Sequence, residues 1–283
     1  MSRRRTVLAA ALSLLPLGQP LLLGSTTALA TGALLLSTQT AVAQSAEVFF
    51  KRGNAKFKKG NYQGAIADFN KVIEINPQLA IAYYNRGTAK HNLKDYQGAI
   101  VDYTKAIEIN PQYAIAYNNR GLVKDKGLGD HQGAISDYTK AIEINPQLAA
   151  PAYYNRGLAK SELKDYQEAI ADYTKAIEIN PQYAIAYYNR GLAKSELKDY
   201  QEAIADYTKA IEINPQYPDV YNNRGLVKDE GLGDHQGAIA DYNKAIEINP
   251  QDAIAYYNRG NAKRVSGDTQ GAIADYNKAI EIN

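Results

Sequence analysis

The residue types that carry most enzyme and metal chemistry are rare in this sequence. Among 283 residues there is no cysteine, and the three histidines, His91, His131 and His235, are too scattered to bind one metal ion. The motifs G-x-S-x-G and H-E-x-x-H and the phosphate-binding P-loop do not occur. The glycine-rich stretches at 127–133 and 231–237 have the wrong spacing for a phosphate loop. We therefore predict that the protein is not an enzyme and holds neither a metal nor a cofactor.

Three charged residues recur together at fixed spacing. Arg190 and Lys194 lie four residues apart and Asp206 follows them, and this set occurs seven times between Arg52 and Asp275. Charges between packed helices have to be paired, and an arginine can hold a carboxylate through two parallel hydrogen bonds. We predict one structural Arg–Asp bridge in each set. The alternative is a basic stripe for an acidic ligand, which does not explain why the Asp recurs with the Arg.

Asparagine and tyrosine also recur, two and three residues before a repeated glycine. The asparagines are Asn85, Asn119, Asn155, Asn189, Asn223 and Asn258. The residues before them include Tyr84, Tyr154, Tyr188 and Tyr257. An Asn amide offers a donor and an acceptor, and tyrosine offers rigid contact area with a polar tip. What these side chains could bind depends on the elements that carry them.

Those elements belong to a sequence that repeats itself every 34 to 36 residues. The glycine of a recurring Arg-Gly pair stands at positions 53, 87, 121, 157, 191, 225 and 260. An alanine follows 12 or 13 residues later, and Asn-Pro closes six of the seven units. We assign the units to residues 46–79, 80–113, 114–148, 149–183, 184–217, 218–252 and 253–283.

Each unit is predicted to contain two helices. In the second, apolar residues from Ala169 to Ile177 recur at spacings of three and four, and Pro181 ends the helix. The first helix contains the repeated glycine, which costs roughly 1 kcal/mol against alanine and therefore indicates a close approach of two helices. The third and sixth units carry an additional residue, which we expect in the turn between the helices, where glycine accommodates the bend.

The glycine, the alanine, a large aromatic residue four positions after that alanine, and the closing proline together resemble the 34-residue tetratricopeptide repeat (TPR). The resemblance covers residues 46–283. It implies an all-α fold in which antiparallel helix pairs stack into a right-handed αα superhelical solenoid of seven TPR units with a concave inner surface. Three departures stand out: the family's usual Trp is Tyr or Phe here, Arg precedes the glycine where an apolar residue is commoner, and Lys lies three residues after the glycine where Tyr is usual.

In this family the first helix lines the concave groove, and an Asn at this place contacts the backbone of extended peptides in members that hold them. The resemblance therefore implies a peptide groove formed by the six asparagines and four tyrosines named above. Neighbouring helices stand about 10 Å apart and an extended chain advances about 3.3 Å per residue, so one Asn could serve three ligand residues. The other explanation is that Asn is tolerated on an exposed helix face and was copied by duplication.

The N-terminus resembles an export signal. Arg3, Arg4 and Arg5 precede an apolar stretch without charge that ends in Ala-Val-Ala at 41–43. We predict a signal peptide at 1–43 and a mature chain at 44–283 in the periplasm or an equivalent extracytoplasmic compartment, the thylakoid lumen if the source is photosynthetic. An uncleaved anchor, and Sec against twin-arginine export, stay open. No other membrane association is expected.

Charge argues against nucleic acid as a partner. Without the three N-terminal arginines, 29 Lys and Arg face 30 Asp and Glu, a net charge of −1. A near-neutral domain lacks the basic surface that binds phosphate backbones. RNA reading by helical repeats would also need base-selecting residues that vary between repeats, and the repeats here are nearly identical.

The last unit is followed by no further repeat in this sequence, so we expect Ile273, Tyr276 and Ile280 to lack cover. An exposed apolar stripe marks an interface, and we predict end-to-end self-association, giving a homo-oligomer, or a docked partner there.

Two functions follow. The first is a non-catalytic scaffold that binds extended peptide or protein segments in the concave groove, in the assembly of extracytoplasmic complexes. The alternative is an architectural solenoid that self-associates through its uncapped ends. The sequence does not identify the partner.

Overall fold

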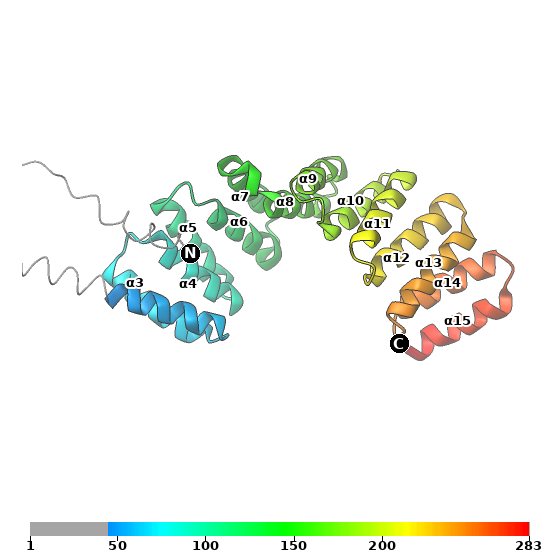
Figure 1. The fold of residues 1–283 in the computed structure, drawn as a ribbon, viewed down its shortest axis with the longest axis horizontal. Coiled ribbons are helices and arrows are strands. Elements are labelled where there is room, and N and C mark those ends of the chain that lie inside the picture. Colours follow the sequence, from blue (N-terminus) through cyan, green and yellow to red (C-terminus); the bar gives the residue numbers. More distant parts are fainter. Residues whose placement is uncertain (1–44, 283) are drawn as a thin grey trace, which may run out of the picture. The chain divides into compact units, whose positions relative to one another are not determined.

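The computed structural model describes residues 45–282 (Figure 1). The predicted signal peptide at residues 1–43 lies outside the described residues, and so do the arginines that bear on its export route. The chain divides into two compact units, residues 1–48 and 49–283. Of the first unit, the structure describes residues 45–48, which are helical.

The second unit is all helical within its described residues, which confirms the predicted fold class. The first helices of the repeats are residues 45–58, α4 (Ala80–Asn92), α6 (Ala114–Leu122), α8 (Ala150–Glu162), α10 (Ala184–Glu196), α12 (Pro218–Leu226) and α14 (Ala253–Val265). The second helices are α3 (Tyr62–Ile75), α5 (Tyr96–Ile109), α7 (His131–Ile144), α9 (Tyr166–Ile179), α11 (Tyr200–Ile213), α13 (His235–Ile248) and α15 (Thr269–Ile282). A short 3-10 turn, η3 (Pro146–Leu148), precedes α8.

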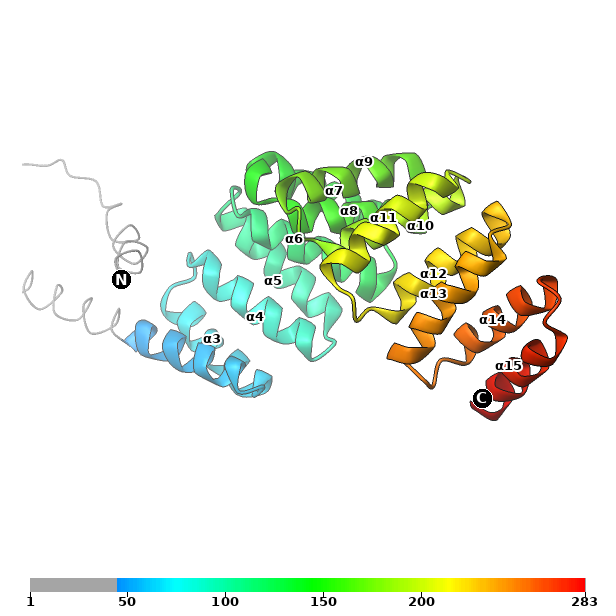
Figure 2. The ribbon, with the colours of Figure 1, turned by 45° about the vertical axis from the view of Figure 1, so that its right-hand side comes forward.

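Each helix from α3 onwards lies beside the next in chain order (Figures 1 and 2). The two helices of a repeat pack against each other, and the second helix of one repeat packs against the first helix of the next. Such serial contact is the arrangement of a solenoid, in which a repeat touches only its neighbours. Each predicted repeat therefore contributes one helix pair to a continuous stack.

Polar residues in the turns set the helix ends. Asp95 caps α5 by accepting a hydrogen bond from the Gly98 amide over 3.0 Å. At the other end, the side chain of Asn110 accepts from the amide of Gln112 over 3.1 Å, which supports the Asn-Pro turn. Equivalent caps begin α3, α7 and α13, whereas α9 and α11 have no side-chain cap bond.

The core packs small residues of both helices around a large aromatic ring of the second helix. Ala203, Tyr207 and Ala210 on α11 are at most 1% exposed. A Cβ on Gly191 would lie 2.7 Å from Cε1 of Tyr207, so only glycine fits beside the ring. A glycine lies against the equivalent tyrosine in six repeats and against Phe69 in the first, which confirms the close helix approach that the repeated glycine predicts.

The additional residue of the third and sixth repeats is not in the turn, where the sequence placed it. It is absorbed at the end of the first helix as a π-helical turn, η2 (Val123–Gly127) and η4 (Val227–Gly231). Gly127 packs on the preceding repeat, and a Cβ there would lie 2.9 Å from the Tyr96 ring. The turn itself keeps one left-handed residue, Gly129, with φ of 70°. Packing against the preceding repeat therefore holds the additional residue within the helix.

Candidate functional site

The recurring Arg, Lys and Asp form one ion-pair cluster within each repeat. In the fifth repeat, Arg190 donates from Nε to Asp206 Oδ2 over 2.8 Å and from Nη2 to Oδ1 over 2.6 Å. Lys194 Nζ lies 2.9 Å from Asp206 Oδ2. Asp206 is only 4% exposed, so its charge needs both cations. All seven repeats contain this cluster, which confirms the structural interpretation of the arginine.

The arginine also joins its repeat to the one before it. The Nη1 group of Arg190 donates to Thr174 Oγ1 on α9 over 3.0 Å. Its guanidinium carbon lies 5.4 Å from the centre of the Tyr187 ring, within cation–π range. One side chain therefore connects three helices, α9, α10 and α11, and its donors face inward rather than toward an acidic ligand.

The six asparagines of the predicted groove lie on the first helices, half-buried, and each donates to the repeat before it. Three reach a tyrosine hydroxyl: Asn119 to Tyr84 over 2.9 Å, Asn189 to Tyr154 over 3.2 Å, and Asn223 to Tyr188 over 2.9 Å. The other three reach an asparagine: Asn85 to Asn54 over 3.0 Å, Asn155 to Asn118 over 3.3 Å, and Asn258 to Asn222 over 3.1 Å. These bonds set neighbouring first helices side by side in register.

Sequence reasoning did not foresee these bonds. They commit one amide hydrogen of each Asn to the protein, and Asn189 and Asn223 use the second as well, on the carbonyls of Ile185 over 2.8 Å and of Asp219 over 2.9 Å. Within the described residues, no hydrogen bond reaches the Oδ1 atom of five of them: Asn85, Asn155, Asn189, Asn223 and Asn258. Asn189 and Asn223 therefore offer a ligand only an acceptor, whereas Asn85, Asn155 and Asn258 keep the acceptor and one amide hydrogen.

Three of the four predicted groove tyrosines pack into the stack. The Tyr154 ring lies 6.0 Å from that of Tyr173 in its own repeat and 5.1 Å from that of Tyr183, which precedes the next repeat. Burial raises the pKa of Tyr154 to about 12, so its hydroxyl is neutral and can accept the bond from Asn189. Tyr84 and Tyr188 have equivalent surroundings. Tyr257 differs and is 55% exposed.

The asparagine belongs to a row of four side chains along one face of each first helix. In α10 the row is Ile185, Asn189, Leu192 and Glu196, spaced by four, three and four residues, so all four lie on one side of the helix. The first three are partly exposed and Glu196 is exposed. We name this set the first-helix row. Its Leu and Glu members were missed in the sequence, although the same helical period that defines the core could have found them.

The C-terminal position of the first-helix row is acidic in the fourth, fifth and sixth repeats. Glu162, Glu196 and Glu230 occupy it in three consecutive repeats, and all three are exposed. In the third repeat this place is taken by Lys126, whose Nζ lies 3.8 Å from Glu162. A segment lying across the rows would meet apolar, amide and carboxylate groups at each step.

Two of the three histidines serve the π-helical turns. His131 Nδ1 lies 2.6 Å from Oδ1 of Asp125, a residue that is 3% exposed, and His235 makes the same contact with Asp229 over 2.5 Å. Such a pair holds the end of the first helix to the start of the second. Within residues 45–282 no group of three or more His, Asp or Glu side chains could hold a metal ion.

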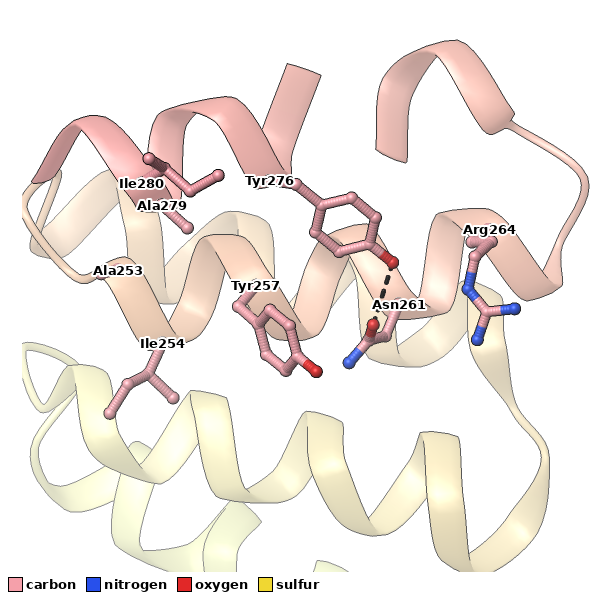
Figure 3. A pocket seen from close by; sticks show the side chains of 8 residues that line it. All are labelled: Ala253, Ile254, Tyr257, Asn261, Arg264, Tyr276, Ala279 and Ile280. Carbon is pink, nitrogen blue, oxygen red and sulfur yellow. Dashed lines mark hydrogen bonds between the residues drawn. The ribbon is translucent and has the colours of Figure 1, made fainter. Parts of the chain in front are cut away.

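The three residues predicted for self-association lie on α15. Ile273 and Ile280 are 53% and 75% exposed. Tyr276 is partly buried, and its hydroxyl donates to Asn261 over 2.9 Å. Beside them is a pocket of about 580 Å³ between α14 and α15, where Ile254 and Tyr257 face Ala279 and Ile280 (Figure 3). In the described part of the chain, no helix is both long and apolar enough to cross a membrane.

These features define a helical repeat protein of the scaffold class. Family models of the tetratricopeptide repeat match residues 80–113, 114–148, 150–183, 184–217 and 253–283, and a TPR repeat model matches residues 53–94 and 232–264. The chain belongs to the TPR family. Comparison with curated proteins gave no match.

Several solved structures are similar to this chain. YrrB, described as a TPR protein with an unusual peptide-binding site, is 26% identical, with a TM-score of 0.56 over 64% of this chain and 92% of YrrB. MamA is 31% identical, with a TM-score of 0.54 over 56% of this chain and 92% of its own. A TPR protein from Parabacteroides merdae is 24% identical, with a TM-score of 0.64 over 85% and 94% of the two chains, and this likeness shows the fold alone.

Proposed function

We propose that this protein is a non-catalytic scaffold that binds extended peptide or protein segments across the first-helix rows. The observation that carries the proposal is the set of asparagine Oδ1 acceptors held in register. Five of them have no hydrogen bond within the described residues, and each Asn is fixed to the neighbouring repeat through its amide nitrogen. The likeness to YrrB, a peptide-binding TPR protein, supports the same function.

The chemistry of the row favours an extended backbone as the ligand. Each Oδ1 can accept one backbone N–H, at a net gain of about 1 kcal/mol per bond. Helices about 10 Å apart match three residues of extended chain at about 3.3 Å each. Because several such bonds are needed for useful affinity, Leu192 and its equivalents supply the remaining contact area as apolar surface.

The acidic end of the row sets a preference among ligand side chains. Glu162, Glu196 and Glu230 are exposed and carry one negative charge per repeat. Lysine or arginine at every third ligand position would be attracted to them, and this attraction weakens as salt is added. A ligand with a basic residue at every third position and apolar residues between therefore fits best.

The test selects 12-residue peptides from a displayed library on the full chain and measures their affinity by fluorescence anisotropy. Asn189→Ala with Asn223→Ala removes two acceptors and should weaken binding about ten-fold or more. The matched control is Tyr154→Phe with Tyr188→Phe, which removes the same two inter-repeat bonds but keeps both asparagines. Equal losses in the two double variants, or no selected peptide, would contradict the proposal.

The proposed place of action is outside the cytoplasm, in the assembly of extracytoplasmic complexes. The support is the sequence alone, since residues 1–43 combine a basic start, an apolar middle and an Ala-Val-Ala end. N-terminal sequencing of the protein from its native cell should begin at residue 44. A chain that keeps its first residues in the cytoplasmic fraction would contradict export.

A further inference from the structure

Within residues 45–282, six junctions join consecutive repeats, and they share one set of contacts. At each junction the arginine of the following repeat donates from Nη1 to a Thr or Asn on the second helix of the preceding repeat. The pairs are Arg86–Asn70, Arg120–Thr104, Arg156–Thr139, Arg190–Thr174, Arg224–Thr208 and Arg259–Asn243, at 2.6–3.0 Å. Each junction therefore has two halves. We call the surface of the following repeat, which carries the arginine, the following half, and the surface of the preceding repeat, which carries the Thr or Asn acceptor, the preceding half.

The first repeat exposes the following half. The Arg52 side chain is 53% exposed, whereas its counterparts in the other repeats are 15–19% exposed. Arg52 binds Asp68 through Nε and Nη2, and no hydrogen bond from its Nη1 occurs within the described residues. Ala55 is also exposed, while the equivalent Ala89 and Ala159 are fully buried. The residue types are those that fill the internal junctions.

The last repeat exposes the preceding half. Ile280 is 75% exposed, whereas the equivalent Ile107 and Ile177 are 8% exposed because the next repeat covers them. Asn277, which stands where Asn243 accepts from Arg259, is exposed and has no hydrogen bond from its side chain within the described residues. In the fifth repeat the equivalents of Tyr276 and Ala279, which are Tyr207 and Ala210, cluster with Val220 of the next first helix. The pocket between α14 and α15 (Figure 3) therefore lies where a following first helix packs elsewhere in the stack.

We propose that the first helix of one copy docks into this pocket of a second copy, so that the internal junction continues from molecule to molecule. In the proposed contact, Arg52 Nη1 donates to Asn277 Oδ1 of the second copy, and Ala55 packs against the second helix of the last repeat. The two halves are different surfaces, so the contact is head-to-tail. It leaves one half free at each end of the assembly, and chains of copies grow with concentration.

Two substitutions at exposed residues block the two halves of the junction one at a time. Ala55→Glu blocks the following half and Ile280→Glu blocks the preceding half, and neither side chain is part of the core of its own repeat. Light scattering on the full chain should give a mass that rises with concentration for the unaltered protein, and the mass of one copy for each variant alone. An equimolar mixture of the two variants should give two copies, because each variant keeps the half that the other lacks.

Controls make the outcomes decisive. Val101→Glu alters a valine that is 65% exposed on α5, away from both halves, and should leave the assembly unchanged. Asn277→Ala removes only the acceptor and should weaken association about five-fold. A mass of one copy for the unaltered protein across micromolar concentrations would overturn the proposal, and so would assembly of either Glu variant alone. The two-copy mass of the mixture also shows that both variants are folded.

Discussion

The ion-pair clusters can be tested through a single carboxylate. Asp172 is 3% exposed and accepts from Arg156 Nε over 2.9 Å and from Nη2 over 2.6 Å, with Lys160 Nζ at 2.9 Å. Asp172→Asn keeps the size and one acceptor but removes the negative charge. Arg156, 16% exposed, then has no anionic partner within the described residues, and Lys160, 13% exposed, keeps only Glu168, a carboxylate that is 71% exposed.

Removal of one partner from a buried ion pair costs about 3–5 kcal/mol. Because both cations keep some contact with water, we expect the lower end, about 3 kcal/mol of unfolding free energy at neutral pH. The measurement is urea unfolding followed by circular dichroism. Asp206→Asn in the next repeat has closely similar partners and should give the same loss.

The first repeat provides a matched control with the same chemistry. Asp68 binds Arg52 and Lys56 in the same geometry, but these cations are 53% and 33% exposed and can be hydrated once the charge is removed. Asp68→Asn should therefore cost much less than Asp172→Asn. Adding Lys160→Met to Asp172→Asn should recover part of the loss, because it removes one of the two cations that have lost the buried carboxylate, although Lys160 keeps its ion pair with the exposed Glu168. Equal losses at Asp68 and Asp172 would refute the argument from burial.

Three further outcomes are expected. Burial raises the pKa of Asp275, but hydrogen bonds from Arg259 and Lys263 outweigh that effect and hold the pKa below 3.8. The ionised Asp275 therefore stabilises the folded protein fully above the pKa of the unfolded state, and this stabilisation is lost as the pH falls through the pKa of the folded state. Asp275→Asn should therefore flatten the fall of melting temperature in acid. Gly231→Ala would place a Cβ 2.9 Å from the Tyr200 ring, and the melting temperature should drop by the equivalent of about 1 kcal/mol, overpacking outweighing helix propensity. Tyr242→Phe should not destabilise, since that buried hydroxyl has no partner within the described residues, whereas Tyr173→Phe loses a hydrogen bond.

The helix pairs could be predicted because their signals are local. Apolar residues at spacings of three and four, the proline after each second helix and the recurring glycine depend on neighbours in the chain, and the structure places helices accordingly. The Arg–Asp bridge could also be predicted, although its partners are 16 or 17 residues apart. The repetition made the pairing predictable, because an arginine and an aspartate that recur together in all seven repeats are expected to form an ion pair in each repeat.

The role of the asparagines needed the three-dimensional arrangement. Asn189 and Tyr154 are 35 residues apart, and the sequence marks both as groove residues without indicating that one donates to the other. The bond exists because the stack sets α8 beside α10, and that spacing depends on how Ala186 packs against α9. Because its second amide hydrogen goes to the Ile185 carbonyl, Asn189 offers an acceptor instead of the donor and acceptor that its chemical type suggested.

The amino-acid sequence was sufficient for the repeat, its helix pairs, the buried charge cluster and the scaffold class, because each depends on residue type at a fixed short period. The tertiary structure was needed for the π-helical turns, where packing of Gly127 on Tyr96 places the additional residue inside a helix. The sequence analysis anticipated the uncovered face of the last repeat, but the tertiary structure was needed for the exposed half at the first repeat, since exposure is a property of what lies beside a residue. Arg52 and Arg190 have the same chemical type, and only the neighbouring repeat makes one half-exposed and the other largely buried.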